Sequence, residues 1–158
     1  MAKVDNWPEF IKNHFSTLPY FKFMEVTVLS TSRGTAKLKL PVKAEYSNTY
    51  GIAHGGIIAS LVDMASGVAL RTLKFRILTL EVSVNYFKPV QLDDELIAEA
   101  KLVQEGRKIL HADIDVFNQN DDLVARGRAI YFVLGEDNEE NYDLETYECL
   151  NKISKSRK

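Results

Sequence analysis

The sequence is poor in the residues that form cross-links and membrane anchors. It has 158 residues and one cysteine, Cys149, which excludes an internal disulfide and a cysteine-built metal site and favours a reducing compartment. The longest apolar stretch, residues 55–70, is interrupted by polar residues and is shorter than the roughly 20 residues that span a bilayer. The first residues lack the apolar core of a signal peptide. We therefore expect a cytoplasmic protein that is free of the membrane.

The sequence also lacks an excess of charge of either sign. Its 20 lysine and arginine residues nearly balance 22 aspartate and glutamate residues, which gives a net charge of −2. This balance does not favour a nucleic-acid partner. Acidic residues crowd positions 136–148, and a basic end follows. We therefore expect a single domain over residues 1–134 and a charged C-terminal tail over residues 135–158.

Two helices are predicted from hydropathy patterns. Asn6 and Glu9 form a capping pair in front of an amphipathic stripe that ends at Phe15, so a short helix is predicted there. Small and apolar residues cover every side of residues 54–73, which is typical of a helix that is buried nearly all round.

The remaining pattern predicts an antiparallel sheet. Segments that alternate with a period of two are expected to be strands, at residues 23–30, 35–42, 78–86, 96–102, 110–116 and 123–133. The third of these is expected to present one inner face made of Leu78, Leu80, Val82, Val84 and Tyr86. An α+β fold with the sheet wrapped around the long helix follows from this order of elements.

Asp63 is the most unusual residue of the long helix. It is the only acidic residue between Glu45 and Glu81, and aspartate is a poor helix former. A buried charge is costly unless it is paired or hydrogen-bonded. A carboxylate kept in such a place is a candidate general base or nucleophile. The structural alternative is that Asp63 caps a loop or pairs with a donor in the core.

The start of the same helix carries a glycine pair, Gly55 and Gly56. Uncovered backbone N–H groups at the positive end of a helix suit an oxyanion, although two glycines also allow close packing of a loop. Gly55 and Asp63 are eight residues apart, about 12 Å along a helix, so one helix cannot present both to the same carbonyl carbon. If both are catalytic, two antiparallel copies must share the site, which predicts a homodimer. Pairing of two dimers into a tetramer is left open.

The stretch from Asn48 to Gly56, followed by Asp63, resembles the signature of PaaI-like hotdog-fold acyl-CoA thioesterases. The segment LEVSVNYFKP, residues 80–89, resembles the strand after the central helix of that family. The resemblance extends over about residues 23–133. It implies a hotdog fold, in which an antiparallel sheet wraps around a long central helix, and hydrolysis of an acyl-CoA thioester to a free carboxylic acid and CoA.

The resemblance also implies a role for each residue of the signature. Asp63 is expected to be the catalytic carboxylate, as general base or nucleophile, and Gly55 to offer its backbone N–H to the thioester oxygen. Asn48 would position water or substrate from the neighbouring chain, and Thr79 would hold the water near the carboxylate. His54 is expected to fix the loop and the helix start, with direct participation in proton transfer as the alternative.

Further residues are candidates for contacts with the substrate. Lys88, Arg107 and Lys108 could receive the phosphates of coenzyme A, with a solvated surface role as the alternative for each. Gly56 is a further candidate contact at the helix start. No metal site is expected, and no cofactor beyond the CoA that the substrate carries.

Two other functions remain open on the same scaffold. One is a non-catalytic acyl-CoA-binding or sensing protein, which would be expected to lack the acid at Asp63 or to carry an effector domain. The other is a hotdog hydratase or dehydratase, which would pair a histidine with an acid in a motif unlike the one around His54. The hydrolase is therefore preferred, and the acyl group is not specified by the sequence.

Overall fold

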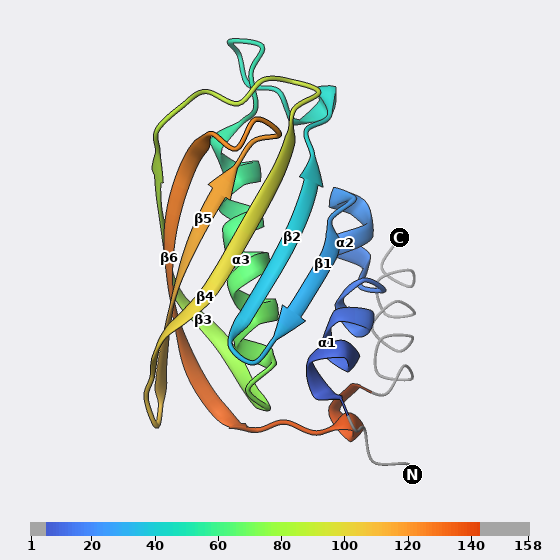
Figure 1. The fold of residues 1–158 in the computed structure, drawn as a ribbon, viewed down its shortest axis with the longest axis vertical. Coiled ribbons are helices and arrows are strands. Elements are labelled where there is room, and N and C mark those ends of the chain that lie inside the picture. The colour runs from blue at the N-terminus through green and yellow to red at the C-terminus, as the bar shows by residue number, and fades with distance from the viewer. Residues whose placement is uncertain (1–5, 143–158) are drawn as a thin grey trace, which may run out of the picture.

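The computed structural model describes residues 6–142 (Figure 1). The helices are α1 (Trp7–Phe15), α2 (Pro19–Met24) and α3 (Gly55–Arg71), with short 3₁₀ turns η1 (Ala44–Tyr46) and η2 (Glu139–Tyr142). The strands are β1 (Thr27–Ser32), β2 (Thr35–Pro41), β3 (Phe75–Tyr86), β4 (Glu95–Glu105), β5 (Ile109–Phe117) and β6 (Leu123–Glu136). The rest of the expected tail, with Cys149, lies outside the described residues.

The six strands form one sheet in the order β1-β2-β4-β5-β6-β3. Every pairing is antiparallel, and the curved sheet wraps around α3 (Figure 1). The predicted α+β hotdog fold is therefore confirmed. None of the helices within residues 6–142 is long and apolar enough to cross a membrane, and the cytoplasmic location stays a prediction.

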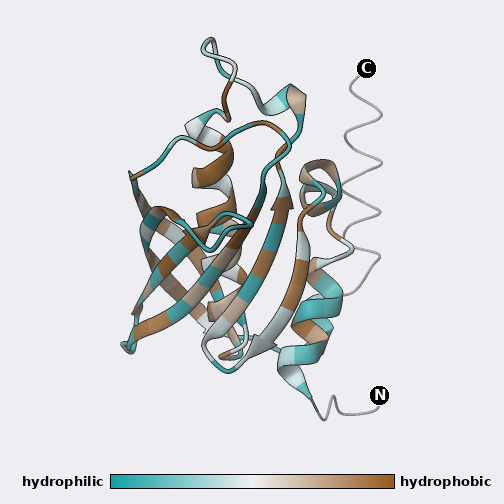
Figure 2. Ribbon diagram, turned by 45° about the horizontal axis from the view of Figure 1, so that its top comes forward, coloured by the Kyte–Doolittle hydropathy of each residue, from teal (hydrophilic) through white to brown (hydrophobic). Residues whose placement is uncertain are grey.

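Alternation along the strands decides which face of the sheet meets α3. Figure 2 shows apolar and polar residues alternating along the strands. On the outer face, neighbouring strands are joined by ion pairs such as Asp113 with Arg128 and Asp115 with Arg126. The inner face is apolar, and a shift of register by one residue would expose it, so the register is well specified. Fully buried strand residues are Leu38, Leu40, Leu96, Ala98, Leu110, Ala112, Ile114 and Val116.

The segment before β1 is a helix and not a strand. The alternating pattern predicted a strand from residue 23, but α2 covers residues 19–24 and β1 begins at Thr27. Pro19 occupies the first turn of α2, where its missing N–H costs nothing. Glu25 ends the helix in the left-handed conformation, with a φ of 55°. These local signals override the period-two pattern, which is too short to determine by itself whether the segment is a helix or a strand.

A β-bulge in β3 changes which side chains point inward. Leu80 is unpaired between Thr79 and Glu81, which pair with consecutive residues of β6. The bulge reverses the alternation, so the prediction that Leu78 and Leu80 share the inner face with Val82 is wrong. These two leucines are 56% and 59% exposed. Thr79 faces α3 instead, as its hydrogen bond to that helix shows.

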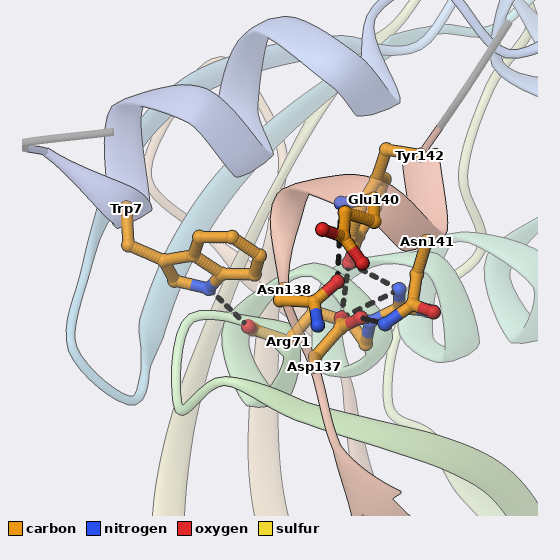
Figure 3. A network of polar contacts seen from close by, with 7 residues as sticks. All are labelled: Trp7, Arg71, Asp137, Asn138, Glu140, Asn141 and Tyr142. Carbon is orange, nitrogen blue, oxygen red and sulfur yellow. Dashed lines mark hydrogen bonds and ion pairs between the residues drawn. The ribbon is translucent and has the colours of Figure 1, made fainter. Parts of the chain in front are cut away.

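Segments from both ends of the described range meet at the C-terminal end of α3 (Figure 3). The Trp7 indole N–H donates to the Arg71 carbonyl oxygen at 2.9 Å. Arg71 Nε donates to the buried Asp137 carboxylate at 2.9 Å, and the Tyr142 hydroxyl donates to the same carboxylate. We call Trp7, His14, Arg71, Asp137 and Tyr142 the terminal cluster. Packing therefore continues to Tyr142, past the domain end expected at residue 134.

The two edges of the sheet differ. β1 is flanked by α1, and Thr31 Oγ1 donates to the Pro8 carbonyl oxygen at 2.8 Å (Figure 1). β3 pairs only with β6, and no second strand within residues 6–142 lies along its other edge. A long free edge is a template for pairing with another strand.

Candidate functional site

Asp63 lies half-buried in the middle of α3, where the helix crosses β3 and β6. Its Oδ1 accepts two hydrogen bonds, from the Tyr131 hydroxyl at 2.7 Å and from Thr79 Oγ1 at 3.1 Å. No donor within residues 6–142 reaches the second oxygen, Oδ2. A carboxylate that is held on one oxygen and open on the other can take a proton from water or attack an electrophile.

Tyr131 is a site residue that the sequence did not single out. Its side chain is buried, at 3% exposed, and its hydroxyl lies 3.0 Å from Ser66 Oγ. Burial, together with the charge of Asp63, raises the pKa of this hydroxyl, so it stays protonated and acts as a donor. The alternating pattern predicted an inward position only. The further signal was a phenol on an otherwise apolar face, because a buried tyrosine hydroxyl needs a partner.

Local packing places these groups together. Thr79 and Tyr131 are paired residues on adjacent strands, so their side chains stand next to each other on one face. Gly127, further along β6, allows α3 to lie close to the sheet, because a Cβ there would be 2.4 Å from Val62 Cγ1. The bulge after Thr79 and the close approach at Gly127 together bring the Asp63 carboxylate within reach of both hydroxyls.

The start of α3 forms a second group of candidate residues. His54 is the N-cap residue, and its Nδ1 accepts from the Gly56 N–H at 2.9 Å. The Tyr86 hydroxyl donates to the Gly55 carbonyl oxygen at 2.8 Å. The Gly55 N–H has no acceptor within residues 6–142, whereas the Gly56 N–H is already bonded. Of the two glycines, Gly55 therefore offers the open donor at the positive end of the helix.

Asn48 shapes the loop in front of α3. Its Oδ1 accepts from the backbone N–H groups of Tyr50 at 2.8 Å and Ile52 at 3.4 Å, which is an Asx-type turn. No hydrogen bond joins Asn48 to Asp63 within the described part of the chain. Asn48 thus belongs with His54 to the group of candidate residues at the start of α3, and not to the group around Asp63.

An open pocket of about 330 Å³ lies beside this helix start. At its rim, Lys88 Nζ lies 2.5 Å from Asp122 Oδ1, so the lysine charge is paired. A larger hollow of about 700 Å³ lies on the outer face of the sheet among charged side chains, and Asp63 does not line it. The smaller pocket is lined by Ile52, Ala53, Gly55, Ile58, Tyr86, Phe87, Lys88, Pro89 and Val90.

The other two predicted cations lie at the opposite end of the sheet. Arg107 and Lys108 are in the β4–β5 hairpin, and Lys108 Nζ lies 5.7 Å from the ring centre of Phe132. Phe132 pairs with Leu78 near the start of β3, whereas Lys88 follows the end of that strand. One chain therefore does not bring Lys88 together with the hairpin. Residues 6–142 contain no cluster of three or more potential metal-ligating side chains.

Comparison with known proteins identifies the family of this chain. Residues 50–125 match the model of the thioesterase superfamily. A protein of Archaeoglobus fulgidus whose name describes it as an esterase is 31% identical over 86% of this chain and 89% of its own length. Human acyl-coenzyme A thioesterase 13 is 26% identical over 66% of this chain and 76% of its own length.

Solved structures share the fold. The Escherichia coli PaaI protein from the phenylacetic acid degradation operon superposes with a TM-score of 0.78 at 22% identity, over 84% of this chain and 97% of its own. A hypothetical thioesterase of Streptococcus pneumoniae, solved with coenzyme A, has a TM-score of 0.70 at 31% identity, over 72% of this chain and 88% of its own. A Streptococcus mutans protein bound to acetyl-CoA has a TM-score of 0.70 at 33% identity, over 72% of this chain and 91% of its own.

Proposed function

Because this chain belongs to the thioesterase superfamily and is a thioester hydrolase of the hotdog fold, we propose that Asp63 is the carboxylate with which it cleaves acyl-CoA to a free acid and CoA. The observation that carries the proposal is the pair of hydrogen bonds that Tyr131 and Thr79 donate to Asp63 Oδ1. They leave Oδ2 open toward a water molecule or the substrate. A half-buried carboxylate that is held in this way is suited to act rather than only to stabilise α3.

Two chemical routes fit this carboxylate. As a general base, Asp63 takes a proton from a water molecule while the water oxygen attacks the thioester carbonyl carbon. As a nucleophile, its Oδ2 attacks the same carbon, and water later hydrolyses the resulting mixed anhydride. In both, the carbonyl electrons move onto oxygen, and when they return the C–S bond breaks and CoA leaves as the thiolate, which then takes up a proton. The Gly55 N–H is suited to stabilise that oxyanion.

The proposal requires a site shared between two subunits. Gly55 and Asp63 lie about 12 Å apart along α3, too far to act on one carbonyl group. The free edge of β3 is suited to pair with the same strand of a second copy about a two-fold axis. Such pairing is antiparallel, so it brings the helix start of one subunit toward the middle of α3 in the other. Asn48, next to the helix start, would then act in the neighbour's site.

Antiparallel pairing also gathers the predicted cations. The start of β3 in one subunit then lies near the end of β3 in the other. Arg107 and Lys108 thereby approach the partner subunit's Lys88, although the hairpin and Lys88 are far apart within one chain. Clustered cations of this kind suit the phosphates of coenzyme A.

Two further structures of the Streptococcus pneumoniae protein support the assignment of Asp63 and Thr79. One is an aspartate-to-alanine mutant and the other a threonine-to-alanine mutant. The two mutated positions are 16 residues apart in that chain, and Asp63 and Thr79 are also 16 residues apart. The coenzyme A and acetyl-CoA in the streptococcal structures support acyl-CoA as the substrate class.

The direct test is hydrolysis of a panel of aromatic, medium-chain and long-chain acyl-CoAs, followed by release of free thiol. Asp63→Asn and Asp63→Ala are expected to lower kcat by about 100-fold or more, the usual contribution of a general base. Glu99→Gln is the matched control, because it removes an exposed carboxylate from β4, a strand that is away from both Asp63 and the free edge of β3. All variants are first compared with the parent by circular dichroism and sedimentation.

The other outcomes have definite meanings. If the parent binds acyl-CoA without turnover, the protein is a binding or sensing module. If it instead adds water to an unsaturated acyl-CoA, it is a hydratase. Full hydrolysis by both Asp63 variants would make this aspartate structural.

A further inference from the structure

We propose that Tyr131 is a positioning residue for the reaction: its hydroxyl holds Asp63 Oδ1 so that Oδ2 is the oxygen that meets water or the thioester. The proposal rests on the proposed function of Asp63. It adds to the candidate site a residue from β6, a strand that lies outside the signature formed by residues 48–56 and Asp63. It also fixes which of the two carboxylate oxygens reacts.

The hydrogen-bond geometry assigns the tyrosine proton to the carboxylate. The Tyr131 hydroxyl lies 2.7 Å from Asp63 Oδ1 and 3.0 Å from both the Asp63 carbonyl oxygen and Ser66 Oγ. A phenol has one proton, and the shorter, charge-assisted bond to a carboxylate is the stronger of these. Ser66 has its own acceptors, the Val62 carbonyl oxygen at 2.9 Å and the Asp63 carbonyl oxygen at 3.0 Å. Tyr131 is therefore free to donate to Asp63.

Burial makes Tyr131 a more rigid anchor than Thr79. The Tyr131 side chain is 3% exposed and packs on the inner face of β6. Thr79 is exposed on the edge strand, and its bond to Asp63 is longer, at 3.1 Å. The terminal torsion of an aspartate is broad, so a carboxylate held by one exposed hydroxyl can rotate. The buried donor removes this freedom before the substrate arrives.

Positioning of this kind affects turnover more than binding. A misplacement of about 1 Å at a reacting group can cost on the order of 100-fold in rate. Because Tyr131 touches Asp63 and not the proposed CoA cations, its loss is expected to lower kcat and leave KM nearly unchanged. Loss of a residue that only supports the fold would lower the stability of the protein without lowering kcat selectively over KM.

The experiment compares Tyr131→Phe with Tyr142→Phe in the full chain. Both changes delete one buried tyrosine hydroxyl that donates to a carboxylate, but Tyr142 donates to Asp137 in the terminal cluster. Tyr131→Phe is expected to lower kcat about 10-fold or more with KM within about 2-fold. Tyr142→Phe is expected to lower the Tm and keep the parental kcat. Each kcat is measured well below the lower Tm, so that loss of folded protein does not contribute.

A double-mutant cycle separates this proposal from the proposed function. In an Asp63→Asn background, Tyr131→Phe is expected to have little further effect on the residual rate, because the group that it positions is gone. An inactive parent would overturn the proposed function itself. A third outcome is an active parent, an inactive Asp63→Asn variant and a Tyr131→Phe variant with the same kcat as the parent. That outcome would overturn only the positioning role of Tyr131. Equal loss of kcat in Tyr131→Phe and Tyr142→Phe would also overturn it, since the loss would then not depend on contact with Asp63.

Discussion

Gly127 marks a place where α3 lies close to the sheet. A Cβ at this position would be 2.4 Å from Val62 Cγ1 and 3.3 Å from the Ser83 carbonyl oxygen. Gly127→Ala is therefore expected to lower the free energy of unfolding by about 1–3 kcal/mol, the usual cost of overpacking. Denaturant unfolding measures the loss. Val62→Ala removes the clashing methyl groups but is itself destabilising in the core, so the double variant should lose less stability than the sum of the two single variants. Unchanged stability of Gly127→Ala alone would show that helix and sheet can separate.

At the scale of single residues, the sequence predicted the acid of the candidate site but not all of its support. Asp63 stood out because a charge inside an apolar helix needs an explanation. Thr79 was assigned by resemblance alone, since its inward direction depends on a bulge that no sequence pattern revealed. Tyr131 was missed because an aromatic residue on an inner face is normally core, and only the position of Asp63 gives its hydroxyl a role.

The docking of α1 against the end of α3 is expected to depend on pH through His14. Burial lowers the pKa of His14 below its usual value of 6.5, nearby Arg71 lowers it further, and Asp137 opposes the shift. The unfolded chain therefore takes up the proton first. The stability that His14 contributes is complete above pH 6.5 and is lost as the pH falls through the lower pKa of the folded state.

The measurement is the Tm of the parent and of His14→Phe between pH 7.5 and 5. His14→Phe keeps a ring against Tyr142, whose centre lies 4.4 Å from that of His14, and it should lose less Tm on acidification than the parent. His111→Phe, on β5 and away from this cluster, controls for loss of a histidine in general. Parallel curves for the parent and His14→Phe would mean that protonation of His14 does not weaken the docking.

Elements with a strong local signal were predicted well. The cap at Asn6 predicted α1, and the apolar residues around Asp63 predicted α3. Turn residues marked the boundaries between the later strands. α2 was missed because six residues are too few for a helical period to show. The terminal cluster was missed for a different reason: its contacts join residues 66 positions apart, such as Arg71 and Asp137, and charge crowding near the end of a sequence resembles a solvated tail.

Assembly of the whole molecule can be tested by mixing two inactive variants. Gly55→Pro removes the proposed oxyanion donor. Proline suits the first position of a helix after an extended residue such as His54, and the added Cβ, 3.2 Å from the Tyr86 ring, requires only a small shift of that exposed side chain. Asp63→Asn removes the carboxylate. If each site takes Gly55 from one subunit and Asp63 from the other, a mixed dimer contains one site with both defects and one intact site.

Co-refolding or co-expression of these two variants, with different affinity tags, isolates the mixed dimer. About half of the parental kcat per dimer is the expected result, because one of two symmetric sites is restored. Each variant alone should remain inactive. If the mixed dimer is as inactive as the two single variants, Gly55 and Asp63 of one site do not come from different subunits.

The fold of the whole molecule was predictable because the order of helix and strands permits few layer arrangements. The assembly stays a prediction that rests on the distance along α3, since no sequence pattern marks the free edge of β3.

The separation of Gly55 from Asp63 along one helix also has a consequence for inheritance. If each site is shared as proposed, a cell that makes normal and Asp63-defective chains forms mixed dimers in which one of the two sites is intact. Total activity then falls in proportion to the share of defective chains, and a defective chain does not inactivate its normal partner. The shared site itself adds a further consequence: a chain defective at Gly55 and a chain defective at Asp63, each inactive alone, form a mixed dimer with one intact site, so two such alleles together restore part of the activity.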